Sequence, residues 1–330
     1  MRVTIKDVAE YAEVAVSTVS RVINNQDRVS SETRERVLSA IRTLGYVKNN
    51  LAASIKTGKT RFIVVVVPEI RNEFYSAVIQ GAESVISKKG YFSLVYTTDE
   101  TYSKEQAVFE GELNHLIDGI ILTPSQSDFN LYSNNSKPMV FIDRIVPESK
   151  VPSICVDNYK GIRLLMDELF NHGHKKIAII VGPLQFNIGI DRLRAYKDAL
   201  SEKNIPLRQE YIRTGEWFEE DGYRLTERLL ELSDPPTAIV ATNNLLGIGC
   251  AECIYDKKLI IGKDISIVSF DDSVVARYLS PGITCIKRPT YEMGVIGANL
   301  LLEMIEEKDM EIANKVLDIT LVKRGSIADV

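Results

Sequence analysis

In the first sixty residues, apolar positions recur at helical spacing in three short stretches. Thr4 is suited to cap a helix over residues 5–12, a second helix is predicted over 16–24, and a third over 31–44. The third helix is expected to end at Gly45, in the left-handed conformation that often follows a helix. Three short helices with a tight turn between the first two are typical of a helix-turn-helix, and also of an ordinary helical bundle.

From residue 61 onward, continuous apolar runs alternate with amphipathic segments. Residues 62–67 are all apolar, as expected of a parallel strand buried on both faces. The strand–helix alternation occurs in two successive series, which favours two lobes whose parallel sheets are covered on both faces. Further strands are predicted at 92–96, 119–122, 139–142, 154–156, 176–181, 238–241 and 265–270, with helices at 74–89, 104–116, 158–172, 188–203, 245–257 and 291–307.

The composition is that of a folded protein of about two domains. The 330 residues are 45% hydrophobic and 26% charged, close to the average for globular proteins. The longest apolar run is far shorter than the roughly 20 residues of a membrane span, so no membrane partner is expected. Because the amino terminus has no signal-like apolar core and four cysteines form no disulfide framework, a cytoplasmic protein is expected.

Charge is distributed unevenly along the chain. The net charge of the chain is −5, but residues 1–60 hold ten Lys and Arg against six Asp and Glu. The net charge is therefore +4 in this segment and −9 in the remainder. A small basic module on a larger acidic body is expected when one end of a protein meets a polyanion. Arg21 on the second predicted helix is suited to contact guanine or phosphate.

The segments 4–9, 17–24, 29–30 and 44–46 resemble, with their spacing intact, the headpiece of the lactose-repressor (LacI/GalR) family of bacterial transcription regulators. This resemblance implies a homodimer that binds double-stranded DNA at a pseudo-palindromic operator. Where the family usually has Gly-Val-Ser in the turn, this chain has Glu13-Val14-Ala15, without the flexible residue and the capping hydroxyl. The headpiece residues expected at the DNA are Thr4, Val16, Ser17, Thr18, Ser20, Arg21 and Asn24.

Residues 48–60 resemble the hinge helix of the same family, which enters the minor groove of the operator. The apolar wedge that kinks the duplex falls on Ile55. The family's usual Pro is Lys48 here, and its frequent Arg before the wedge is Ala53. The hinge residues expected at the DNA are Asn49, Ala52, Ile55 and Lys56.

Residues 61–330 resemble the type I periplasmic-binding-protein fold of this family, on segments 68–75, 140–144, 173–178, 192–196 and 269–272. The expected fold is therefore α/β, with a helix-turn-helix headpiece (1–47), a hinge (48–60) and a two-lobed effector domain (61–330). The first lobe is expected at about 61–158 and 290–320, and the second at about 159–289 and 321–330. In such folds, ligands bind between the lobes at the carboxyl ends of the strands.

The resemblance implies a small sugar-like effector in this cleft. The family's Asn-Asp pair is Asn243-Asn244 here, and loss of that carboxylate beside Arg144, Arg192, Arg194 and 287–288 predicts a more cationic cleft. We therefore consider a sugar acid or sugar phosphate alongside a neutral sugar. The residues expected to line the cleft are Phe74, Tyr75, Arg144, Arg192, Trp217, Asn244 and Asp271.

Other functions have weaker support. We find no catalytic motif, so an enzyme is not expected, and no cofactor is implied. Cys250 and Cys253 lack the second pair that a zinc site needs, so no metal is expected. A sugar-binding protein without DNA binding and a catabolite regulator controlled by a carrier protein remain as alternatives.

Overall fold

The computed structural model describes residues 3–25, 29–46, 59–133, 135–306 and 313–330. The chain divides into two compact units, Met1–Thr60 and Arg61–Val330, and each is described by itself. No helix in the described ranges is both long and apolar enough to cross a membrane.

The described headpiece folds into α1 (Ile5–Tyr11), α2 (Val16–Ile23) and α3 (Ser31–Leu44). Their apolar faces meet in a small core that includes Val8, Val19, Val22, Val37 and Ala40. The three predicted helices are confirmed, and Gly45 has the expected left-handed backbone, with a φ of 63°.

The turn between α1 and α2 has the two unfavourable features that its sequence predicts. Glu13 has a φ of 53°, in the left-handed region that glycine adopts without the steric cost of a Cβ atom. Ala15 is the N-cap of α2 and has no side-chain acceptor for the first amides of that helix. The turn therefore forms despite its residues, because the buried face of α2 holds the helix in place.

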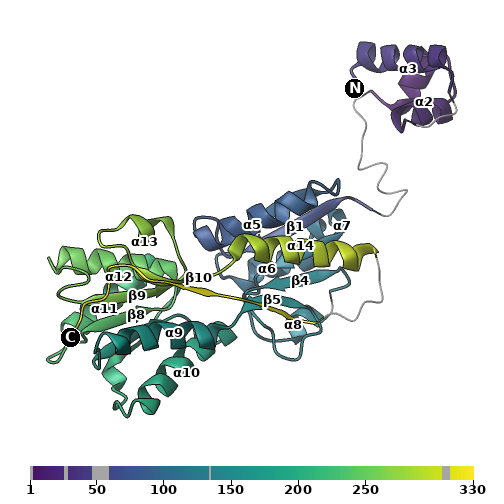
Figure 1. The fold of residues 1–330 in the computed structure, drawn as a ribbon. Helices are drawn as coiled ribbons and strands as arrows, with labels where there is room; N and C mark the ends of the chain where they lie inside the picture. Colours follow the sequence, from purple (N-terminus) through teal and green to yellow (C-terminus); the bar gives the residue numbers. More distant parts are fainter. Residues whose placement is uncertain (1–2, 26–28, 47–58, 134, 307–312) are drawn as a thin grey trace. The chain divides into compact units, whose positions relative to one another are not determined.

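The second unit contains two six-stranded sheets with the same strand order. Figure 1 shows the two sheets with their helices as separate groups. The first runs β2-β1-β3-β4-β5-β11, and the second runs β7-β6-β8-β9-β10-β12. All pairs are parallel except β10 with β12. We call each sheet with its helices a lobe. In both lobes the strand order changes direction next to the first strand of the lobe, β1 or β6. α/β proteins bind ligands at the carboxyl ends of the strands beside such a change of direction.

The first lobe consists of β1 (Phe62–Val67), α5 (Glu73–Ile86), β2 (Phe92–Thr97), α6 (Tyr102–Glu110), α7 (Glu112–Leu116), β3 (Gly119–Leu122), α8 (Asn130–Ser133), β4 (Met139–Ile142), β5 (Ser153–Val156), α14 (Thr290–Glu306) and β11 (Lys315–Leu317).

The second lobe consists of α9 (Asn158–Asn171), β6 (Ile177–Val181), α10 (Asn187–Glu202), β7 (Ile212–Thr214), α11 (Glu219–Leu230), β8 (Ala238–Ala241), α12 (Asn244–Asp256), β9 (Ser266–Phe270), α13 (Val274–Tyr278), β10 (Thr284–Lys287) and β12 (Thr320–Val322). The chain thus crosses between the lobes at 157, 288–289 and 318–319.

The strands are continuously apolar because both faces of each sheet are covered. In β1, Ile63 and Val65 pack into the core under α5 and α14, whereas Val64 and Val66 pack into a second core with Val108 of α6. Five of the six residues of β1 are buried without alternation and Phe62 is half-buried, as the sequence pattern predicts for such a strand. The cores hold the carboxyl ends of the strands, and so the loops that follow them, in fixed positions.

Two segments differ from the sequence-based expectation. The helix predicted over 104–116 is interrupted at Gly111, whose extended backbone ends α6 and starts α7. The strands β7, β10, β11 and β12 and the helices α8 and α13 were not predicted, because each has five residues or fewer. Helix α11 was also missed, although its apolar residues recur at helical spacing.

Candidate functional site: a DNA-facing helix and an interlobe cavity

Helix α2 exposes most of the residues expected at DNA. Val16 is 42% exposed, and Ser17, Arg21 and Asn24 are also exposed, opposite the buried Val19. The half-buried Thr18 and Ser20 lie on the same helix.

Thr4 is the exposed N-cap of α1, and its hydroxyl donates to Asp7 Oδ2 at 2.8 Å. Helix α2 thus presents small side chains and one guanidinium group, that of Arg21, on its exposed face. The expected hinge contacts Asn49, Ala52, Ile55 and Lys56 lie outside the described residues.

A cavity of about 250 Å³ lies between the two lobes, beyond the carboxyl ends of their strands. Six of the seven residues expected in the cleft line it, namely Phe74, Tyr75, Arg144, Arg192, Trp217 and Asp271. The same lining includes Pro68, Glu69, Arg71, Asn72, Asp99, Glu100, Asp143, Ile188, Phe218, Asn243, Leu245 and Arg288.

Aromatic side chains from both lobes form part of the cavity wall. Phe74 and Tyr75 lie on the first turn of α5 and are buried, and Asn72 fixes that turn because its Oδ1 accepts the Phe74 N–H at 3.0 Å. Trp217 approaches from the second lobe, and its buried Nε1 has no hydrogen-bond partner among the described residues. Aromatic faces of this kind stack on the apolar side of a sugar ring or on another ring.

Arg192 contributes a buried guanidinium group that is bonded to neutral acceptors. Its Nε and Nη2 donate to Asn158 Oδ1 at 3.0 and 2.7 Å, and Nη1 donates to the Thr242 carbonyl. The group lies 3.7 Å from the centre of the Phe270 ring. Burial, with a smaller effect from the nearby Arg288, lowers the pKa of Arg192 to about 10. An oxygen acceptor on a ligand would stabilise this charge.

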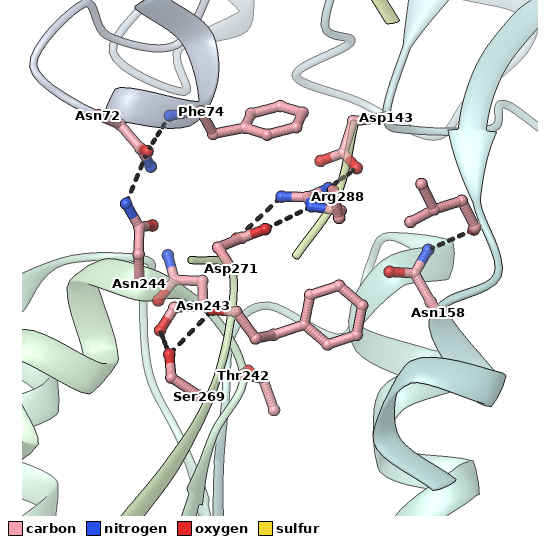
Figure 2. Close-up of polar contacts among 12 residues, drawn as sticks. Asn72, Phe74, Asp143, Asn158, Thr242, Asn243, Asn244, Ser269, Asp271 and Arg288 are labelled. Carbon is pink, nitrogen blue, oxygen red and sulfur yellow. Dashed lines mark hydrogen bonds and ion pairs between the residues drawn. The ribbon is translucent and has the colours of Figure 1, made fainter. Parts of the chain in front are cut away.

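Two aspartates at equivalent positions of the two lobes share one arginine (Figure 2). Asp143 follows β4 and Asp271 follows β9, and both have a left-handed backbone, with φ of 70° and 75°. Arg288 donates from Nη1 to Asp143 Oδ1 at 2.5 Å and from Nη2 to Asp271 Oδ2 at 2.8 Å. Strained backbone at two facing carboxylates is typical of a binding site.

A second ion pair, between the buried Arg144 and the half-buried Glu100, lines the cavity on the side of the first lobe. Arg144 donates from Nη1 and Nη2 to the two carboxylate oxygens of Glu100, at 2.7 and 2.6 Å. Asp99 and Glu100 also have left-handed backbones, with φ of 49° and 56°. The Arg144 guanidinium lies 3.9 Å from the centre of the Phe186 ring in the second lobe.

The expectation of a cationic cleft is wrong. Arg194 is exposed and pairs with Asp191 at 2.9 Å, and Lys287 is exposed at the end of β10, so neither lines the cavity. The lining contains four arginines against five carboxylates, and three of those arginines are paired with carboxylates. The arginines are 71, 144, 192 and 288, and the carboxylates are 69, 99, 100, 143 and 271.

The expectation for Asn244 also needs correction. Asn243 lines the cavity, while Asn244 begins α12 and donates across the lobes to Asn72 Oδ1 at 3.0 Å (Figure 2). Sequence reasoning missed Asn72 and Asp143 as site residues. A signal was present for Asp143, because it follows its strand as Asp271 does in the other lobe.

Comparisons with known proteins agree with this architecture. Residues 4–49 match the family model for bacterial regulatory proteins of the lacI family, and residues 166–327 match a periplasmic binding protein-like domain. The HTH-type transcriptional repressor CytR of Escherichia coli is 31% identical over 98% of this chain and 96% of its own length.

Solved structures give the same result. The lac repressor dimer bound to operator and the anti-inducer ONPF is 27% identical, with a TM-score of 0.87 over 99% of both chains. The complex of the transcriptional regulator CelR with cellobiose is 29% identical, with a TM-score of 0.74 over 98% of this chain and all of that one. These relatives are regulators and not enzymes, and this chain belongs to the lacI family of DNA-binding bacterial transcription regulators.

Proposed function

We propose that this protein represses genes of sugar metabolism, with a neutral sugar or glycoside in the interlobe cavity controlling its affinity for the operator. The charge of the cavity lining supports a neutral ligand, because carboxylates outnumber arginines there. A sugar phosphate would bring two further negative charges next to these carboxylates. A neutral sugar needs the hydrogen bonds and aromatic faces that the cavity offers, and the related CelR structure holds cellobiose.

Three groups are placed to bind such a ligand. The remaining N–H donors of Arg192 and the indole N–H of Trp217 are suited to hydroxyl or ring oxygens. Asp143 uses Oδ1 for Arg288, which leaves Oδ2 as an acceptor for a hydroxyl. Phe74 offers a ring at the same cavity.

The ligand would change operator affinity by changing the arrangement of the two lobes relative to each other. The lobes meet around the cavity through Asn72 with Asn244, through Glu73 with the Val274 N–H, and through Asn187 with the Ile145 N–H. A ligand that prefers one arrangement of these contacts shifts the population toward it. A coupling of about 1–3 kcal/mol corresponds to roughly 5- to 150-fold regulation of operator binding.

DNA binding is proposed to occur as a homodimer in the cytoplasm, with α2 of each copy in one half-site. The related lac repressor binds its operator as a dimer. Large apolar side chains that a second copy would cover are exposed on edge strand β2, where Phe92 is 59% exposed, and on α13, where Tyr278 is 83% exposed. Sedimentation equilibrium should give twice the mass of one chain.

The ligand class is tested by titrating the protein with neutral sugars, sugar acids and sugar phosphates while following fluorescence of Trp217, the single tryptophan. We expect saturable changes with a neutral sugar and none with the phosphates. Arg192→Gln should weaken that binding at least tenfold, whereas Arg194→Gln, outside the cavity, should leave it unchanged. A response to acids or phosphates alone would overturn the proposed ligand class.

A further inference from the structure

Arg288 holds the two lobes together from the segment that connects them. It follows β10 of the second lobe and precedes α14 of the first. Its Nη1 reaches Asp143 in the first lobe, and its Nε and Nη2 reach Asp271 in the second (Figure 2). One guanidinium group thus bonds a carboxylate in each lobe.

Water does not screen this cluster of charges. The side chains of Arg288, Asp143 and Asp271 are 3%, 4% and 7% exposed. Phe74 covers the guanidinium on one face, with 3.9 Å between its ring centre and Cζ, and Phe270 lies at 5.6 Å. Buried carboxylates in such surroundings require a counter-ion, because neither the solvent nor the aromatic rings can replace one.

The cluster also lies in the cavity wall. Asp143, Asp271 and Arg288 all line the cavity, and the left-handed backbones of the two aspartates fix where their carboxylates point. Any ligand in the cavity therefore meets two carboxylates whose two negative charges are offset in part by the one positive charge of Arg288. With a neutral residue at 288, a cationic group on the ligand would take the place of the guanidinium.

We propose that Arg288 is a specificity-determining residue, the internal counter-ion that makes this cavity favour uncharged ligands over cationic ones. The proposal rests on the proposed function for its ligand class, because it assumes that the cavity binds sugars. It extends that function by giving Arg288 two roles. Arg288 sets the charge preference of the cavity, and its ion pairs connect the two lobes.

The charge preference is tested with two pairs of probes, D-glucose with D-glucosamine and D-galactose with D-galactosamine, by titration calorimetry at neutral pH. The unmodified protein should prefer the neutral member of each pair. Arg288→Gln should shift the ratio of affinities at least tenfold toward the amino sugar, and adding Asp271→Asn should reverse most of this shift. An unchanged ratio in Arg288→Gln would overturn the proposal.

The control for these titrations is Arg194→Gln, which removes an exposed arginine outside the cavity and should leave the ratio unchanged. If the unmodified protein binds neither member of either pair, nor any other sugar, the proposed ligand class fails. The role of Arg288 is then decided by a measurement that needs no ligand.

That measurement is urea unfolding of the full chain, followed by Trp217 fluorescence. Arg288→Gln leaves two buried carboxylates without a counter-ion, so the unfolding equilibrium constant should rise roughly 100-fold or more. The triple variant Asp143→Asn, Arg288→Gln, Asp271→Asn has no charge to compensate, and its constant should return to within about tenfold of the unmodified value. A packing role for the arginine would instead leave the triple variant as unstable as Arg288→Gln.

Each remaining outcome also decides the question. If Arg288→Gln cannot be purified in folded form, a folded triple variant supports the counter-ion role, and an unfolded triple variant contradicts it. If Arg288→Gln is as stable as the unmodified protein, the carboxylates do not depend on Arg288 and the proposal is wrong.

Discussion

Gly182 lies directly against the indole ring of Trp217, so that a Cβ atom on Gly182 would stand 2.3 Å from the ring carbons. Gly182 follows β6 at the carboxyl end of the second sheet, where a side chain would occupy the space of the indole. Trp217 follows β7, the next strand along the chain. Its position in the cavity wall therefore depends on the absence of a side chain at Gly182.

This relationship predicts that Gly182→Ala displaces Trp217 and weakens ligand binding about tenfold or more, because the methyl group needs space that the ring now fills. Titration calorimetry with the sugar identified for the unmodified protein measures the loss. Thermal unfolding is the control, and a folded Gly182→Ala protein with unchanged affinity would show that Trp217 does not contribute to the site.

The turn between α1 and α2 predicts that the headpiece can be stabilised. Glu13→Gly removes the left-handed strain at Glu13, and Ala15→Ser supplies an N-cap, so each should stabilise the headpiece by about 1 kcal/mol. Slower hydrogen exchange of the α2 amides in the full chain would report this gain. Ser30→Ala, which removes the cap of α3, should have the opposite effect on α3.

Arg21 is expected to carry much of the sequence recognition by α2. Arg21→Ala should weaken binding to the preferred operator by roughly 5- to 150-fold, as for loss of a bidentate contact with guanine. Arg42→Ala on α3 is the matched control, since it removes another exposed arginine from the headpiece. Equal losses for the two variants, on specific and random DNA alike, would mean that Arg21 contacts phosphate and not a base.

His174 makes the stability of the second lobe depend on pH. Its Nδ1 and Nε2 bond to Thr237 Oγ1 and Ser266 Oγ at 2.8 and 2.9 Å, and burial lowers the pKa of the imidazole below its ordinary 6.5. As pH falls through 6.5, the unfolded chain gains a proton that the folded chain does not, so the free energy of unfolding decreases.

The measurement is urea unfolding at pH 7.5 and pH 5.5 for the unmodified protein and for His174→Gln. The unmodified protein should lose more of its free energy of unfolding between these two values than the variant does. If both proteins lose the same amount, other groups account for the pH dependence.

Local patterns predicted the helices of the headpiece and most longer elements, because caps such as Thr4 and apolar runs such as β1 are visible in the sequence. The charge of the cavity was not predictable in this way. Arg144 and Arg288 look like free cations in the sequence, but their partners Glu100 and Asp143 come from distant segments that only the folded sheets bring together. The position of Asn244 was missed for a related reason. At the start of α12, Asn243 lines the cavity, whereas the side chain of the next residue, Asn244, points toward Asn72.

We propose that a neutral sugar in the interlobe cavity controls operator binding. The most direct measurement is fluorescence anisotropy of a labelled operator, selected by the full-length protein from random DNA, with and without the sugar that binds in the calorimeter. We predict that the selected DNA has two-fold related half-sites and that the sugar changes its affinity by at least about fivefold, an effect lost in Arg192→Gln. An operator affinity that stays constant while the sugar saturates the cavity would contradict the account.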